Sequence, residues 1–126
     1  MPNYGSLPIT GTGTGQPSTA LGSGDQLALF NAETLTAPQS SIAISQVPGI
    51  GGPTEITFSI AFAAAPTSSL VIQGANTDAD GAYQTLYTST NKQADNYTDT
   101  VAWGYYRAQL VSQSAGGACT VIARAK

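Results

Sequence analysis

Apolar and polar residues alternate strictly in the middle of the chain, between residues 54 and 62. Ile56, Phe58, Ile60 and Phe62 occupy every second position, and the residues between them are small or polar. Successive side chains of a β-strand point to opposite faces of its sheet, so this spacing puts the four apolar side chains on one face. The pattern predicts a strand with one buried face and one exposed face.

Other short segments of the same kind follow one another along the chain, separated by stretches rich in Gly, Pro, Asn and Asp that favour turns. The expected strands cover residues 26–31, 41–45, 54–62, 70–74, 83–88, 97–101, 105–111 and 119–125. About eight short strands without a helix predict an all-β fold, an antiparallel β-sandwich or jelly roll. Its two sheets are expected to bury Phe58, Phe62, Ile72, Leu86, Tyr106, Leu110 and Val121.

The first 25 residues differ from the rest, because they are dominated by Gly, Thr and Ser. Such a composition is typical of a linker or tail. The segment also carries spaced apolar side chains that suit anchoring on a neighbouring subunit, namely Tyr4, Leu7, Ile9 and Leu21. We therefore expect an extended N-terminal arm over residues 1–25 that binds a partner, followed by one β-sandwich domain over residues 26–126.

The charge balance narrows the choice of partners. The chain has 4 Lys+Arg and 7 Asp+Glu, for a net charge of -3, and Lys92 is its first basic residue. Nucleic-acid binding requires several basic side chains to replace phosphate counterions, so neither nucleic acid nor an anionic membrane surface is expected as a partner. No apolar run is long enough to span a membrane, and the first residues do not form a secretory signal. We expect synthesis in a cytoplasm.

Catalytic chemistry has little to build on in this sequence. Histidine is absent, which removes the commonest general base and metal ligand. The single cysteine, Cys119, lies in a predicted strand and is interpreted as a small core or interface residue rather than a reactive thiol. The chain is expected to have no catalytic residue and no cofactor, and so not to be an enzyme.

The acidic residues suggest two possible sites, a calcium loop and a catalytic carboxylate pair. Asn76, Asp78, Asp80 and Gly81 have the spacing of the first half of a calcium loop, but the last position of such a loop falls on Tyr87 instead of a glutamate. Two of the carboxylates Asp78, Asp80, Asp95 and Asp99 could also face each other across a cleft, as in a glycosidase. Asp is common in turns for backbone reasons alone, so we expect neither a metal site nor a catalytic pair.

Aromatic residues are concentrated in the second half of the chain. Trp103 and Tyr105 are the candidates for exposed aromatic contacts, because adjacent residues on one strand face opposite ways and Tyr106 is expected to be buried. Aromatic side chains bind sugars by stacking and also anchor protein interfaces. The sequence leaves open an aromatic platform for carbohydrate.

The stretch from about residue 54 to 125 resembles a known family. Residues 70–78 read LVIQGANTD, residues 83–90 read YQTLYTST, and residues 106–110 read YRAQL. This resembles the small β-sandwich proteins of tailed-bacteriophage virions, in which a V-x-V-x-G-S-N-D-G-x-W-x-x-L hairpin precedes an R-Y-V-R-A-x-L strand. Ala75 stands in place of the usual Ser, and Ala82 and Tyr83 stand where Asn and Trp are common.

The resemblance implies a structural role in the virion without catalysis. The expected function is decoration or cementing of a phage capsid, through self-association as a homo-oligomer and through contacts with the major capsid protein. Two alternatives remain open: another phage structural protein associated with the tail or a fibre, and a carbohydrate-binding β-sandwich module.

Overall fold

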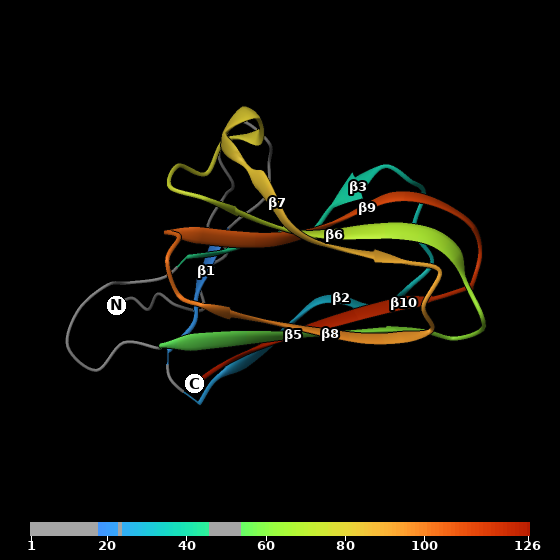
Figure 1. Ribbon diagram of the computed structural model, residues 1–126, viewed down its shortest axis with the longest axis horizontal. Helices are drawn as coiled ribbons and strands as arrows, with labels where there is room; N and C mark the ends of the chain where they lie inside the picture. Colours follow the sequence, from blue (N-terminus) through green and yellow to red (C-terminus); the bar gives the residue numbers. More distant parts are fainter. Residues whose placement is uncertain (1–17, 23, 46–53) are drawn as a thin grey trace, which may run out of the picture.

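The computed structural model describes residues 18–22, 24–45 and 54–126. Within them ten strands form two sheets that face each other (Figure 1). The first sheet contains β1 (Ser18–Ala20), β3 (Gln39–Ser40), β4 (Ala43–Ser45), β6 (Thr67–Ala75), β7 (Gln84–Thr90) and β9 (Tyr105–Ala115). The second sheet contains β2 (Gln26–Glu33), β5 (Glu55–Phe62), β8 (Ala94–Thr100) and β10 (Cys119–Ala125).

The strand order is that of a jelly roll. The first sheet runs β1-β4-β9-β6-β7, with β3 also paired to β9, and the second runs β2-β10-β5-β8. All pairs are antiparallel except β1 with β4. Successive long strands mostly alternate between the two sheets, which gives the double-layer architecture of a jelly roll. The predicted all-β sandwich is confirmed.

Strand β5 shows why the sequence pattern was informative. Its four apolar side chains face the other sheet, and all four are at most 5% exposed. Ser59 and Ala61, on the opposite face, are exposed. The alternation therefore sets which face of the strand is buried, because a shift of one residue would turn every apolar side chain to solvent.

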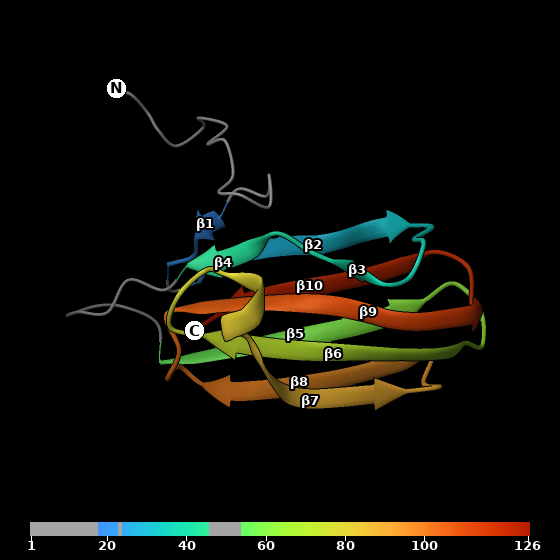
Figure 2. The ribbon, with the colours of Figure 1, turned by 90° about the horizontal axis from the view of Figure 1, so that it is seen from above.

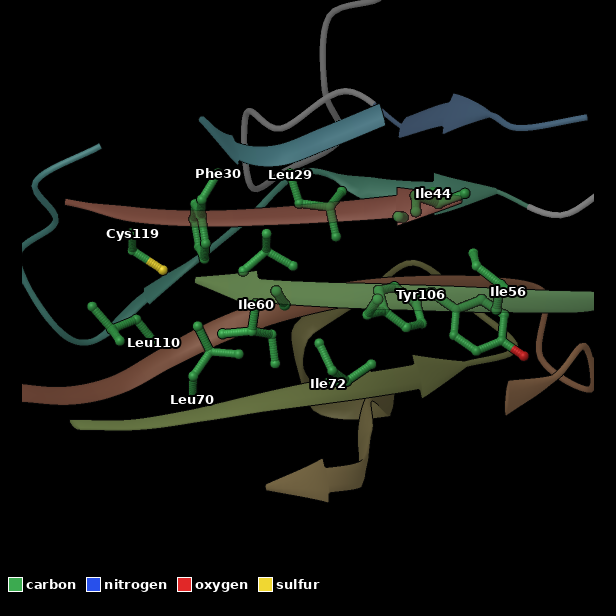
Figure 3. Close-up of a cluster of buried hydrophobic side chains, with 14 of the residues drawn as sticks. Leu29, Phe30, Ile44, Ile56, Ile60, Leu70, Ile72, Tyr106, Leu110 and Cys119 are labelled. Carbon is green, nitrogen blue, oxygen red and sulfur yellow. The ribbon is translucent and has the colours of Figure 1, made fainter. Parts of the chain in front are cut away.

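The core fills the space between the two sheets (Figure 3). Of the side chains predicted to be buried, Leu86 is half-buried because it lies on the edge strand β7, and the others are buried. Tyr106, on the central strand β9, is the largest of the fully buried side chains. The sulfur atom of Cys119 lies in the same core, as the sequence predicted.

Strand β8 begins earlier than the sequence predicted. The sequence predicted a strand over residues 97–101, after a polar stretch, but β8 starts at Ala94, which pairs with Ala61 of β5. The polar residues Asn96 and Thr98 are compatible with a strand here because their side chains lie on the exposed face. Pairing with β5 therefore outweighs the loop-like composition of this segment.

The strand formed by β3 and β4 is interrupted at Ser41, whose hydroxyl group takes over part of the ladder. The Ser41 Oγ atom accepts a hydrogen bond of 3.0 Å from the amide of Ala108 and donates one of 2.8 Å to the carbonyl of Ile42. The side chain thus satisfies a backbone donor of the central strand β9 at the break. This is the expected behaviour of serine next to an irregular strand.

The turn between β9 and β10 depends on glycine. Gly116 and Gly117 have φ angles of 128° and 70°, in the region that side chains with a Cβ atom rarely adopt. A Cβ atom on Gly116 would also come within 2.8 Å of the Cβ atom of Pro66. The glycine pair therefore allows both the backbone turn and its close packing on the preceding strand connection.

Each sheet has an outer strand at either edge. Strands β7 and β8 are the outer strands of their sheets on one side, and β1 and β2 are the outer strands on the other (Figure 2). The loop that carries the short 3-10 helix η1 (Asp80–Ala82) stands over the outer face of the first sheet (Figure 1). None of the described residues forms a helix long and apolar enough to cross a bilayer.

Candidate functional site

The residues of the predicted N-terminal arm fall into two groups. Tyr4, Leu7 and Ile9 lie outside the described residues. Leu21 is described, is 5% exposed, and packs in the hydrophobic core of its own domain. Strand β1, directly before it, pairs with β4. The last part of the segment over residues 1–25 is thus a strand and a core anchor of the sandwich, and the Leu21 side chain is already covered by its own chain.

The two candidate aromatic contacts are both half-buried. Trp103 packs against the core, and its ring lies so close to Gly74 that a Cβ atom there would come within 2.7 Å of it. The Trp103 ring therefore occupies the space beside β6 that a side chain at Gly74 would need. Tyr105 begins the central strand β9 between Ser45 and Ala75. The structure places Trp103 as a packing residue and leaves Tyr105 partly accessible.

The loop over residues 76–83 is held to the sheet by Arg107. The Arg107 side chain donates hydrogen bonds from Nη1 to Asp80 Oδ1 (2.8 Å) and from Nε to Gln73 Oε1 (2.9 Å). Its guanidinium carbon lies 3.9 Å from the centre of the Tyr83 ring. The Tyr83 hydroxyl in turn donates to Asp78 Oδ1 at 2.8 Å. These contacts clamp the loop onto the outer face of β6 and β9.

The clamp explains how a charged side chain can be buried there. Arg107 is only 7% exposed, and a buried guanidinium needs hydrogen-bond partners and an opposite charge. Gln73, Asp80 and the ring of Tyr83 supply them. Burial, with a further contribution from Asp78, raises the pKa of the Tyr83 hydroxyl above its usual value, so this donor stays protonated at neutral pH. The two carboxylates of the calcium-like sequence are thus engaged by protein groups.

A second polar network closes the side of the sandwich between β7 and β8. The rings of Tyr87 and Tyr97 stack with their centres 5.0 Å apart and an angle of 9° between their planes. The Tyr87 hydroxyl donates to Asp95, and the Tyr97 hydroxyl donates to Asp99 at 2.8 Å. Tyrosines of the two edge strands thereby bridge the sheets, and each ring keeps its polar end paired.

Electrostatics favour the charged form of Asp95 in this network. Burial alone would raise the pKa of its carboxyl group. Hydrogen bonds from the Tyr87 hydroxyl and the Asn96 amide, together with the charge of Lys92, outweigh burial and hold the pKa below its usual value. Asp95 is therefore ionised in the folded protein at neutral pH, where it accepts hydrogen bonds only.

Tyr106 connects this network to the core. Its hydroxyl donates to Asp99 Oδ2 at 2.7 Å and accepts hydrogen bonds from the amides of Ala102 (3.1 Å) and Trp103 (3.4 Å). Burial and the hydrogen bond to Asp99 raise the pKa of Tyr106 to about 12. For the same reasons the pKa of Tyr97 also rises to about 12. The arrangement is that of a structural network, with each donor matched to an acceptor.

The acidic residues considered as a catalytic pair belong to different layers. Asp78 and Asp80 lie in the loop over the first sheet, whereas Asp95 and Asp99 lie on β8 of the second. All four accept a hydrogen bond from a tyrosine or an arginine. Residues 18–22, 24–45 and 54–126 contain no cluster of three or more potential metal ligands. The thiol of Cys119 is buried. This burial is the larger cause, and the nearby charge of Glu33 the smaller one, that together raise the pKa of Cys119 to about 11.

Fold and site together define a jelly-roll β-sandwich stabilised by side-chain networks on one outer face and one edge. Among solved structures, the fold is similar to that of YomS, a protein derived from the SPBc2 prophage. The two align with a TM-score of 0.55 and 15% sequence identity, over 79% of this chain and 90% of YomS. No protein-family model and no curated protein sequence matches the chain.

A second solved structure is more distant. It is the pre-peptidase C-terminal domain of a Bacillus anthracis collagenase, which aligns with a TM-score of 0.47 and 11% identity over 88% of this chain and 96% of that domain. This similarity is too weak to support an argument about function. The comparison with YomS supports the fold.

Proposed function

We propose that the protein is a non-enzymatic structural component of a phage virion that decorates or cements the capsid. The similarity of its fold to prophage-derived YomS carries the proposal. In this role the chain contacts the major capsid protein and further copies of itself. A protein that binds only the assembled shell stabilises that shell by mass action, in proportion to its affinity and concentration.

The surface of the second sheet suits broad, weak contacts of this kind. On its outer face the hydroxyls of Thr57 and Thr98 share a hydrogen bond of 2.9 Å, and Ser59 donates to Asn96 at 3.1 Å. Polar groups that are already paired within the protein can be covered by a partner without losing their hydrogen bonds. Such a face can therefore be buried at low cost in desolvation.

Apolar contact contributes little on the described surface. Val111, at 44% exposure, is the single large hydrophobic residue that is exposed among the described residues. The chain also has few charges. We assign the shell-facing surface to the outer face of β5, β8 and β10, where a shallow hollow lies between Gln26, Ser59 and Arg124. Affinity then comes from area and from many copies rather than from a few strong anchors.

The proposal can be tested by adding the purified full chain to phage particles that lack it and sedimenting the particles. The expected result is saturable co-sedimentation with the heads, and a Ser59→Arg variant that binds more weakly because the new side chain disrupts the flat face. Thr85→Arg, which adds the same charge at an exposed position of the other sheet, is the matched control.

Two outcomes would contradict parts of the proposal. Absence of binding to heads, with the label found on tails or fibres by electron microscopy, would exclude capsid decoration and favour the tail-associated alternative. Equal binding by the parent and both variants would leave capsid decoration standing, but would move the contact away from the outer face of the second sheet.

A further inference from the structure

Strand β7 is the outer strand of the first sheet, on the side where β8 is the outer strand of the second (Figure 2). Its first half rises toward η1, and its second half runs along the edge of the sheet (Figure 1). The single register shift of β7 against β6 falls at Leu86, between the two halves. Residues 87–90 therefore continue the sheet in regular register, and no described strand pairs with their other side.

The four outer strands of the described sheets differ in what they expose to another chain. An edge strand is a template for pairing, which charged side chains, irregular backbone or a short length prevent. β8 carries Asp95 and Asp99, β2 carries Glu33 and has two register shifts against β10, and β1 has only three residues. β7, with the sequence QTLYTST, has no charge, no proline and no glycine. Its threonines and tyrosine favour strand structure, so β7 is the outer strand best suited to strand addition.

Two large side chains at this edge are incompletely buried by their own chain. Leu86 and Tyr87 pack against the hydrophobic core but stay half-buried. A strand added beside β7 would cover more of both side chains and remove apolar surface from water. The backbone N–H and C=O groups that point away from β6 would gain partners in the same step. The edge therefore offers a partner strand both apolar area and backbone hydrogen-bonding groups.

We propose that the partner is β7 of a second copy of this chain, added antiparallel about a two-fold axis. Such an axis places the strand against itself, so a charge near the axis would meet an equal charge on the other copy. β7 has no charge and meets this condition, whereas self-pairing of β8 would bring aspartates together. The inference specifies the contact between sister copies and in that respect rests on the proposed function. It does not require the contact with the shell.

The pleat of the strand determines where the axis can lie. Residues directly opposite each other must share a face of the sheet, so the axis has to pass through a residue and not between two. An axis through Thr88 pairs residues 86–90, up to the point where Asn91 leaves the strand with a φ angle of 55°. An axis through Ser89 would pair residues 88–90 alone, and one through Tyr87 would enclose the register shift. We therefore place Thr88 opposite Thr88 of the partner subunit.

This arrangement closes at two copies. The two-fold axis uses the β7 edge of both molecules, and the outer strands that remain are β1, β2 and β8, which resist addition for the reasons given above. The outer face of the second sheet stays uncovered, because β7 belongs to the first sheet. A dimer of this kind can therefore present two copies of the surface assigned to the shell.

The test is sedimentation velocity of the purified full chain over about 10 μM to 1 mM, a range suited to a small interface. We expect a monomer–dimer equilibrium without larger species. Amide hydrogen exchange, measured at both ends of this range, should show that residues 86–90 become more protected as the dimer forms. This second measurement uses the parent chain and does not depend on the folding of any variant.

Complementary charges at one position test the two-fold axis directly. Thr88 is exposed in the single chain, so Thr88→Lys and Thr88→Asp should both keep the fold, which circular dichroism checks. Each variant alone places like charges opposite each other and should weaken dimerisation about tenfold or more. An equal mixture of the two should recover it, because lysine then faces aspartate. Thr85→Lys, at an exposed position of β7 before the register shift, is the matched control and should dimerise like the parent.

Four results would overturn the inference: a parent that stays monomeric over the whole range, assemblies that grow beyond two copies, dimers that Thr88→Lys does not weaken, and a mixture that does not recover. Binding of the same proteins to phage heads separates this inference from the proposed function. A parent that dimerises as expected but does not bind heads would contradict capsid decoration alone. A parent that binds heads but stays monomeric would contradict the β7 contact alone.

Discussion

Replacing Phe58 with alanine should destabilise the protein more than any change on the other face of the same strand. Phe58 is fully buried in the middle of β5, and its ring lies 6.4 Å from that of Tyr97 and 5.8 Å from that of Tyr106, between centres. Phe58→Ala removes these contacts and leaves a cavity, which typically costs about 3–5 kcal/mol. That is a large part of a typical unfolding free energy of about 5–15 kcal/mol.

Ser59→Ala is the matched control, one residue further along the strand. Ser59 is exposed, and the substitution removes one hydrogen bond of 3.1 Å to Asn96. Because both groups can bond to water instead, the loss should stay below about 1 kcal/mol. The two variants thus change neighbouring positions of one strand but differ in the face that they alter.

The measurement is a guanidinium titration followed by far-UV circular dichroism for the parent and both variants. A lower midpoint with an unchanged slope would report lost stability, whereas a changed slope would indicate a different unfolded or native state. Similar losses at the two positions would refute the reasoning, since they would mean that β5 is buried on both faces.

Four further predictions follow from burial and charge. Leu21→Ala should cost about 2–5 kcal/mol, because this side chain belongs to the core, and an unchanged melting temperature would assign it to the surface instead. Cys119 should react with a thiol reagent only after denaturation, since its sulfur is buried and its pKa is about 11; rapid labelling of the native protein would contradict this. Folding lowers the pKa of Asp95, so the stability that its ionised carboxylate contributes should be complete above about pH 4 and should be lost as the pH falls further. An Asp95→Asn variant should lose less stability over the same acidification. Folding raises the pKa values of Tyr97 and Tyr106 to about 12, so the stability that their hydroxyls contribute should persist below about pH 10 and be lost above it. Thermal melts across the pH range would show both the acid limit set by Asp95 and the alkaline limit set by the tyrosines. A melting temperature that does not change on acidification or above about pH 10 would contradict these two predictions.

The sequence predicted the layers of this fold because strand periodicity is a local signal. The alternation in β5 fixed its buried face, and the pattern around Tyr106 and Leu110 placed both in the core, where the structure has them. Leu86 was also expected to be buried, but its strand has a neighbour on one side only. Whether a strand lies at the centre or the edge of its sheet depends on the order of strands, which local alternation does not report.

The beginning of the domain could not be located from composition. The segment before residue 25 is rich in Gly, Ser and Thr, and these residues predict a tail. Its described part nevertheless pairs with β4, more than twenty positions further along the chain, where Ser18 opposes Ala43. Backbone pairing with β4 and the burial of Leu21 override the local preference, because both depend on residues that are distant in the sequence.

The clamp on the η1 loop could not be predicted from the sequence for the same reason. Arg107 stood out only as part of a resemblance, and its partners Gln73 and Asp80 lie 34 and 27 positions earlier. The turn carrying Asp80 was considered as a calcium loop because its oxygen-bearing residues have suitable spacing. The direction in which a carboxylate points depends on the strand that passes beneath it, and here that strand presents an arginine.

The edges of the two sheets bear on how this protein can associate with others. An open edge strand pairs readily with another chain, and natural proteins prevent this with inward-facing charges and bulges. Asp95 and Asp99 of β8 oppose the buried residues Ile60 and Ile56 and therefore face inward. On the other side, β2 has register shifts against β10, and Ala32 adopts a φ angle of 51°. Strand addition is disfavoured at both edges of the second sheet. The proposed contact with the shell, which we assign to the outer face of this sheet, can form without extending the sheet and without the open-ended growth that edge pairing would allow.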